Sequence, residues 1–185
     1  MRFNKHYNVE GTHAILSCSQ NSWIRKTDEE FDEWISNSKA AEEGTELHAI
    51  AAKLIKKRIR LPDDQATLNM YVNDAIGFRM TPEQPLYYSP NCFGTADTIS
   101  FSKNFLRIHD LKTGETDTSF NQLKVYAALF CLEYRYKPEE LDGIELRIYQ
   151  NNDVRVLNPD AIDIQRIMDT IVQFDRQIEK LKMEE

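Results

Sequence analysis

Asp97, Asp110 and Lys112 are the residues whose types and spacing point most directly to chemistry. They lie in residues 86–112, where polar and apolar side chains alternate and Tyr, Phe, Ile and Thr are frequent. That pattern, with a polar break at Ser102-Lys103-Asn104, predicts a β-hairpin. If the turn is centred on Lys103 and Asn104, Asp97 lies directly opposite Asp110, and Lys112 shares their face of the sheet. A turn of three residues would offset this pair.

Two carboxylates placed opposite each other beside apolar neighbours repel, so the pair needs positive charge nearby. Lys112 supplies one charge, and a divalent cation between Asp97 and Asp110 would supply the rest. Hard cations such as Mg²⁺ prefer carboxylate oxygens and retain waters. The alternative is a salt bridge from Lys112 to one aspartate, with a proton on the other. The hairpin therefore predicts either a metal site or a compensated charge cluster.

Helices and further strands surround this hairpin in the predicted fold. Apolar residues at helical spacing predict a helix over residues 45–60, which Pro62 would end. The order of helices, strands, helix, strands and helix predicts an α/β fold with a central mixed sheet flanked by helices on both sides. The other expected helices cover residues 21–25, 28–36, 64–80, 119–134 and 160–182, and the other expected strands cover 143–150 and 153–157.

Composition limits the class of protein. A chain of 185 residues, 41% of them hydrophobic, predicts one domain with a buried core. We divide it into an N-terminal helical segment (1–40), a core (44–157) and a C-terminal helix (160–183). A net charge of -7 argues against a protein that coats nucleic acid generally. With no apolar run of about 18 residues and three scattered cysteines, we expect a cytoplasmic protein without a membrane span or an iron-sulfur cluster.

Four short motifs in order resemble those of the PD-(D/E)xK nuclease superfamily, most closely its RecB-like branch with the compact phage-type exonucleases. They are Gly44-Thr45-Glu46-Leu47-His48, Gly94-Thr95-Ala96-Asp97, Asp110-Leu111-Lys112 and Gln122-Leu123-Lys124-Val125-Tyr126. The resemblance covers residues 44–126 and implies a restriction-endonuclease-like core. Residues outside this range carry no motif of the family.

The resemblance implies roles for individual residues. Asp97, Asp110, His48 and the main-chain carbonyl of Leu111 would bind Mg²⁺ or Mn²⁺. Lys112 would position or polarise the attacking water. Gln122 and Tyr126, four apart on one helix face, match the QxxxY element of this branch and would contact the metal site or DNA.

A basic stripe follows His48 in the sequence. Lys53, Lys56, Lys57 and Arg60 are spaced to share one face of the helix expected over residues 45–60. Such a stripe is often only a solvated helix face. Beside an acidic site it becomes a candidate track for the phosphate backbone of DNA.

The expected function is hydrolysis of phosphodiester bonds at DNA ends, in phage or bacterial recombination or repair. The resemblance implies linear duplex DNA as substrate, a bacterial or phage-infected cell, and a single-strand annealing or other recombination protein as a partner. The closing helix also permits a homo-oligomer. Two alternatives stay open: an inactive nuclease-fold module that binds DNA or protein, and a structure-specific endonuclease or ribonuclease.

Overall fold

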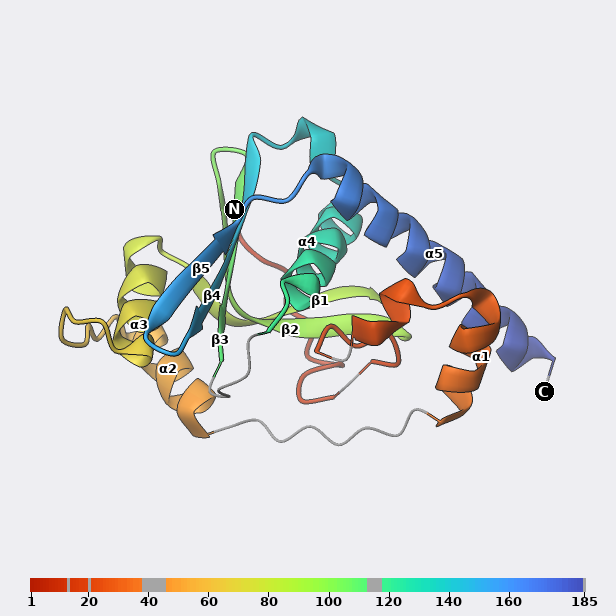
Figure 1. Cartoon of the computed structure of the whole chain (residues 1–185), viewed down its shortest axis with the longest axis horizontal. Helices are drawn as coiled ribbons and strands as arrows, with labels where there is room; N and C mark the ends of the chain where they lie inside the picture. The colour runs from red at the N-terminus through yellow and green to blue at the C-terminus, as the bar shows by residue number, and fades with distance from the viewer. Residues whose placement is uncertain (13, 20, 38–45, 113–117, 185) are drawn as a thin grey trace.

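A five-stranded mixed sheet with helices on both faces organises the chain in the computed structural model (Figure 1). The structure describes residues 1–12, 14–19, 21–37, 46–112 and 118–184. The strands are β1 (Thr81–Ser89), β2 (Cys92–Ser102), β3 (Phe105–Leu111), β4 (Gly143–Gln150) and β5 (Asp153–Leu157). The helices are η1 (Asn21–Arg25), α1 (Asp28–Asn37), α2 (Glu46–Lys57), α3 (Thr67–Gly77), α4 (Asn121–Tyr134), η2 (Pro138–Glu140) and α5 (Ala161–Met183).

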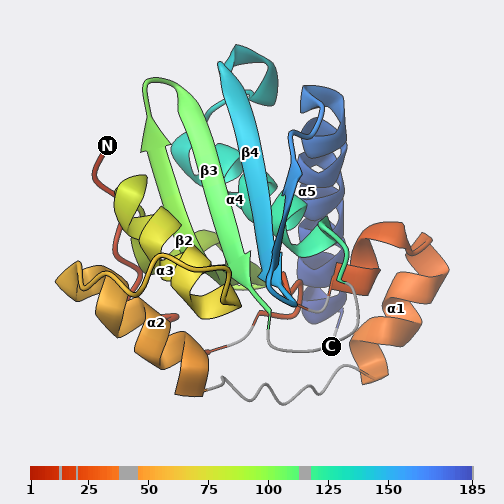
Figure 2. The same ribbon diagram turned by 60° about the vertical axis from the view of Figure 1, so that its left-hand side comes forward.

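The strands lie side by side in chain order, and only β3 and β4 run parallel. Helix α4 connects these two strands and covers one face of the sheet, with α5 packed on its outer side (Figure 2). Helices α2 and α3 cover the other face. The α/β class and the mixed sheet with helices on both sides are confirmed.

Two asparagine-containing turns fix the strand pairing. Lys103 and Asn104 have φ of 51° and 56°, and Asn151 and Asn152 have φ of 53° and 57°. Two consecutive residues with positive φ form the two-residue hairpin turn whose twist matches that of the strands. The predicted two-residue turn between β2 and β3 is therefore confirmed.

The sheet has an apolar core on each face. On the α4 side, the fully buried Ile99, Leu106 and Ile108 contact residues of α4 and α5. On the other side, Leu111 and Tyr149 pack with residues of α2 and α3. The central strands β2, β3 and β4 are thus largely buried on both faces, whereas the edge strand β5 is more exposed.

Three expectations about the elements are wrong. Helix α2 ends at Lys57, before Pro62. It ends there because Arg58 has a left-handed φ of 54° and the Ile59 N–H donates a hydrogen bond to the Leu54 carbonyl, which closes the last turn. The helix expected over residues 64–80 ends at Gly77. Strand β1 then begins at Thr81, which the sequence analysis did not anticipate because prolines interrupt it. Among the described helices, none combines the length and apolar composition needed to cross a bilayer.

Candidate active site

Asp110 is the most deeply buried carboxylate of the predicted site. It lies in β3 and is only 1% exposed. Lys112 Nζ lies 2.9 Å from its Oδ2 as an ion pair, and Oδ1 has no hydrogen-bond partner among the described residues. Burial, and then the negative charge of Asp97, raises the pKa of Asp110 to about 7, whereas Lys112 lowers it. One buried carboxylate oxygen, Oδ1, thus lacks a donor, an uncommon condition in a folded protein.

Asp97 lies in β2 where β2 and β3 separate. The predicted register is confirmed from Ser102–Phe105 to Thr98–His109, which is the last pair of the ladder. Asp97 and Asp110 come next but are not paired, which corrects the expectation of direct opposition. Instead, Asp97 Oδ2 accepts a hydrogen bond of 3.0 Å from the Leu111 N–H. The two aspartates therefore stay at one end of the hairpin, in a less symmetric arrangement than predicted.

His48 reaches this site from the first turn of α2. Its Nδ1 lies 3.4 Å from Asp97 Oδ2, and its side chain is partly exposed. A hydrogen bond to Asp97 raises the pKa of His48, although partial burial opposes this. The structure thus brings together the histidine and aspartate that the sequence analysis assigned to one metal site. Residues 44 and 45 of the same motif lie outside the described residues.

Lys112 joins the aspartates to the helix motif. Its Nζ donates a hydrogen bond of 2.7 Å to Gln122 Oε1 on α4. Gln122 Nε2 lies 3.4 Å from the Tyr126 hydroxyl, which donates a 2.5 Å hydrogen bond to the Thr95 carbonyl. Gln122 and Tyr126 therefore occupy the predicted shared face, and a polar chain runs from Asp110 through Lys112 back to β2.

The glycine of the motif before Asp97 has a packing role. A Cβ at Gly94 would come within 2.9 Å of Cys18 Sγ and 3.1 Å of the Tyr126 ring. Tyr126 is 4% exposed, so its ring has little room to move aside. Gly94 thus permits the close packing that holds the Tyr126 hydroxyl against Thr95.

Glu83 is a carboxylate near the site that the sequence analysis missed. Pro82 pairs with Thr98 and Gln84 with Ala96, which places Glu83 opposite Asp97 across β1 and β2. Its φ is 53°, unusual for a non-glycine residue in a strand. Partial desolvation, and then the charge of Asp97, raises the pKa of Glu83, while His48 and Lys56 lower it. No sequence signal could have identified it, because β1 was not predicted to begin before it.

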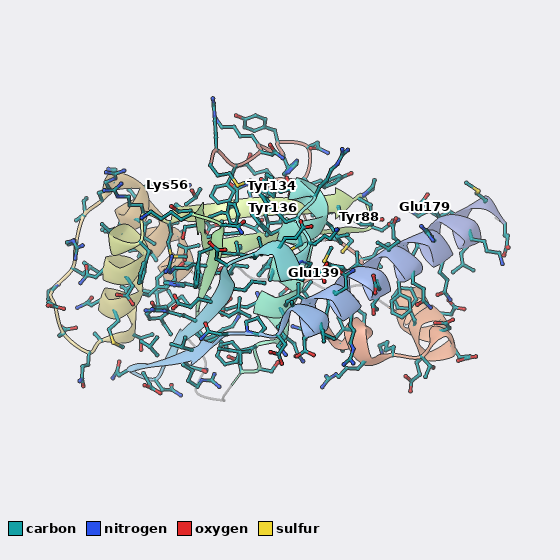
Figure 3. All side chains as sticks on the ribbon, turned by 90° about the horizontal axis from the view of Figure 1, so that it is seen from above. Lys56, Tyr88, Tyr134, Tyr136, Glu139 and Glu179 are labelled. Atoms are coloured by element: carbon teal, nitrogen blue, oxygen red, sulfur yellow. The ribbon has the colours of Figure 1, made fainter. Side chains whose placement is uncertain are left out.

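The predicted basic stripe is only partly present. Lys53, Lys56 and Lys57 are exposed on α2, and Figure 3 shows Lys56 at the opposite end of the molecule from Glu179 of α5. Arg60 lies beyond the end of α2, so placing it in the helical stripe was wrong. Its Nη2 lies beside Gly77 of α3. Three lysines therefore form the basic surface that leads away from His48.

The site residues fit a hard divalent cation in their chemistry. Carboxylate oxygens of Asp97 and Asp110 and a backbone carbonyl such as that of Leu111 are oxygen ligands that Mg²⁺ accepts, and His48 adds a nitrogen suited to Mn²⁺. Asp110 Oδ1, which has no donor among the described residues, is available for such an ion. In the described part of the chain, no three His, Cys, Asp or Glu side chains form a ready-made metal cluster.

Comparisons with known proteins identify a shared region but no activity. A family model described as "Protein of unknown function (DUF2800)" matches residues 83–173, from β1 into α5. The chain is also similar to a protein in a solved structure, "Crystal structure of SSO0001", with 15% identity and a TM-score of 0.32. That likeness covers 75% of this chain and 80% of the other. No curated protein matches.

Proposed function

We propose that this chain is a metal-dependent deoxyribonuclease that hydrolyses phosphodiester bonds at DNA ends, with a restriction-endonuclease-like core of the PD-(D/E)xK type. The observation that carries the proposal is buried Asp110, whose Oδ1 has no donor among the described residues, beside Asp97, His48 and Lys112. Burial and the charge of Asp97 disfavour the ionised form of Asp110. A dication would stabilise it, and the same ion would serve phosphodiester hydrolysis.

His48, Asp97, Asp110 and the Leu111 carbonyl would hold the ion, Mg²⁺ or Mn²⁺. When bound, the ion would lower the pKa of a water and stabilise the charge that develops on the phosphate. Asp110 must lose its proton before it can act as a ligand. Its raised pKa therefore makes ion binding depend on pH near neutrality.

Lys112 and Gln122 would orient the attacking water and the phosphate. Gln122 Oε1 and Asp110 together hold the Lys112 ammonium group at the carboxylate cluster. A positively charged donor fixed there can hydrogen-bond to a water or to a phosphate oxygen. The hydrogen bond from the Tyr126 hydroxyl to the Thr95 carbonyl holds Tyr126 next to Gln122 Nε2 and so helps to position Gln122. These contacts explain why an amide and a phenol four residues apart would serve the site.

The exposed lysines of α2 would bind the DNA backbone. Lys53, Lys56 and Lys57 follow His48 on the same helix, so phosphates bound there would lie on a path toward the carboxylates. We extend the proposal to linear duplex ends as substrate, and to a single-strand annealing or other recombination protein as a partner, because of the resemblance of the four motifs. A homo-oligomer is compatible with this role.

Digestion of end-labelled linear duplex beside closed circular DNA tests the proposal, with Mg²⁺, Mn²⁺ or EDTA present. We expect loss of the linear DNA alone, with either metal and not with EDTA. Lys112→Ala, purified identically, should be inactive and controls for a contaminating nuclease. If the folded protein degrades neither DNA with either metal, the nuclease proposal is wrong and a binding module becomes the better explanation.

A further inference from the structure

We propose that Glu83 is a third carboxylate of the candidate metal centre, a positioning residue that binds the divalent cation through the water shell of that cation. This inference rests on the metal site of the proposed nuclease and adds a residue that none of its four motifs contains. It assigns to β1 a direct part in holding the cation.

Glu83 lies in β1 beside the candidate metal site. Pro82–Thr98 and Gln84–Ala96 are ladder partners, so Glu83 is opposite Asp97 where β2 leaves β3. The carboxylate of Glu83 interacts electrostatically with Asp97, with His48 and with Lys56. It therefore borders the two proposed ligands that come from β2 and α2.

The buried carboxylate of Asp110 has an oxygen that can still accept a ligand. This side chain is 1% exposed, its Oδ2 pairs with Lys112, and its Oδ1 has no hydrogen-bond donor among the described residues. Burial and the charge of Asp97 raise the pKa of both Asp110 and Glu83, so neither carboxylate is fully stabilised as an anion by Lys112, His48 and Lys56. A dication bound among the three carboxylates would stabilise them, which makes Glu83 part of the charge balance of the same site.

The backbone of Glu83 adopts an unfavourable conformation. Its φ of 53° disfavours any residue with a Cβ, and glycine would adopt it readily. This left-handed residue interrupts the regular backbone of β1 between two ladder pairs, next to the candidate site. Mg²⁺ keeps several of its waters when bound to protein, and an exposed carboxylate at the rim can accept hydrogen bonds from them.

Titration with Mn²⁺, followed by its electron paramagnetic resonance signal in the absence of DNA, tests this role. We expect Glu83→Gln and Glu83→Asp each to weaken Mn²⁺ binding about 10- to 100-fold. The aspartate keeps the charge but draws it back toward β1 by one methylene. Glu139→Gln is the matched control, because Glu139 is an exposed glutamate in η2 (Figure 3). It should bind Mn²⁺ as the wild type does.

Glu83→Gly separates function from structure. Glycine relieves the positive φ but adds freedom to the unfolded chain, so we expect the melting temperature in EDTA to change by no more than about 3 °C while Mn²⁺ affinity falls. A large loss of melting temperature in both Glu83→Gly and Glu83→Gln would mark Glu83 as a structural residue and overturn the proposal. Unchanged affinity in Glu83→Gln, or full affinity in Glu83→Asp, would overturn it as well.

These measurements are independent of DNA cleavage. If Mn²⁺ affinity depends on Glu83 but no DNA is cut, the metal role stands and the nuclease proposal fails. If DNA is cut but substitution of Glu83 leaves the Mn²⁺ affinity unchanged, the nuclease proposal stands and this inference fails. If the wild type binds no Mn²⁺, both fail.

Discussion

Two polar clusters lie back to back on β3, and they differ in how their charges are compensated. Asp110 faces the α4 side, whereas the preceding residue, His109, faces α3 and is fully buried. On that second face, Tyr149 donates a 2.6 Å hydrogen bond to Asp74, and its hydroxyl lies 3.2 Å from His109 Nδ1. Arg147 donates to Asp74 as well, at 3.0 Å.

The cluster around His109 balances its charges from within. Arg107 and Arg147 both contact Glu145, and Arg147 also pairs with Asp74. Two arginines thus match two carboxylates, and burial lowers the pKa of His109, which favours its neutral form. The described atoms there without a well-formed hydrogen bond, His109 Nε2 and Arg107 Nε, both face Glu145.

The cluster around Asp110 is compensated differently. Lys112 pairs with Asp110 Oδ2 and His48 lies beside Asp97, but Asp110 Oδ1 faces no donor among the described residues. The central residues of the two clusters are equally buried, so burial does not distinguish a functional site here. A buried carboxylate oxygen without a donor, near a second carboxylate, does, because it is a ligand atom that an ion from solution can use.

The largest effect should follow from removing Lys112. We expect Lys112→Ala to lower the rate of DNA cleavage at saturating Mg²⁺ by about 100- to 1000-fold, because a fixed cationic donor at the reacting phosphate is lost. DNA binding, measured by fluorescence anisotropy, should persist. Lys124→Ala is the matched control, since Lys124 is a partly exposed lysine on α4 that pairs with Asp163. Comparable cleavage by the two variants would remove Lys112 from the mechanism.

Breaking the cluster around His109 should affect stability and not metal binding. Arg147→Ala leaves Asp74 and Glu145 without their shared partner, so we expect a loss of about 1 to 3 kcal/mol in the free energy of unfolding by urea. Mn²⁺ affinity should stay unchanged within about twofold. A large loss of Mn²⁺ affinity in the folded variant would show that the two clusters are coupled.

The opposite response is expected at Asp110. Asp110→Asn removes the charge of a buried carboxylate whose Oδ1 lacks a donor, so the metal-free protein should gain about 1 to 2 kcal/mol in EDTA at pH 8. The same variant should lose the stabilisation that Mn²⁺ gives to the wild type. Urea titrations with and without Mn²⁺ measure both quantities. Destabilisation of the metal-free variant would indicate a compensated salt bridge instead of a vacant ligand.

The stability of the metal-free protein should depend on pH because the buried Asp110 carboxyl ionises. The pKa of Asp110 rises from 3.8 to about 7 on folding, so the folded state binds more protons between these values. The contribution of Asp110 to stability must therefore decline as pH rises from about 4 to about 7 and stay constant above. Comparing wild type with Asp110→Asn in EDTA across this range isolates that contribution. Parallel curves for the two proteins would contradict it.

The smallest effect is expected on the α2 surface. Removing Lys53, Lys56 and Lys57 together should weaken binding to every duplex sequence, and should reduce the slope of log affinity against log salt by up to about 3. Lys103→Ala, at the exposed turn between β2 and β3, is a single-lysine control for altered net charge. An unchanged slope in the triple variant would leave these lysines as a solvated helix face.

Local patterns in the sequence predicted much of the sheet. Strands β4 and β5 and their Asn151-Asn152 turn follow directly from alternation and turn chemistry. The second half of β1 lies in the predicted strand region, which began at Leu86, but its first half was missed: Pro82 and Pro85 are typical of loops, yet an edge strand tolerates them. With the start of β1 missing, Glu83 could not be placed opposite Asp97.

Contacts between distant elements were harder to predict. The spacing of Asp97, Asp110 and Lys112 placed them at one end of a hairpin, and Gln122 and Tyr126 on one helix face. The β2–β3 ladder ends before Asp97, where the Leu111 N–H donates to the Asp97 side chain and not to the backbone of β2. No periodicity in the sequence predicts that hydrogen bond. The end of α2 at Lys57, which leaves Arg60 outside the helix, depends on the left-handed Arg58, a residue that is not glycine.

The most direct test of the metal site is a crystal structure of the protein soaked in Mn²⁺, with anomalous diffraction recorded at the manganese edge. Our account predicts one strong anomalous peak within bonding distance of Asp97 and Asp110, on the side where His48 approaches Asp97. Saturating Mn²⁺ with no anomalous density between these carboxylates, and Lys112 still paired with Asp110, would contradict it.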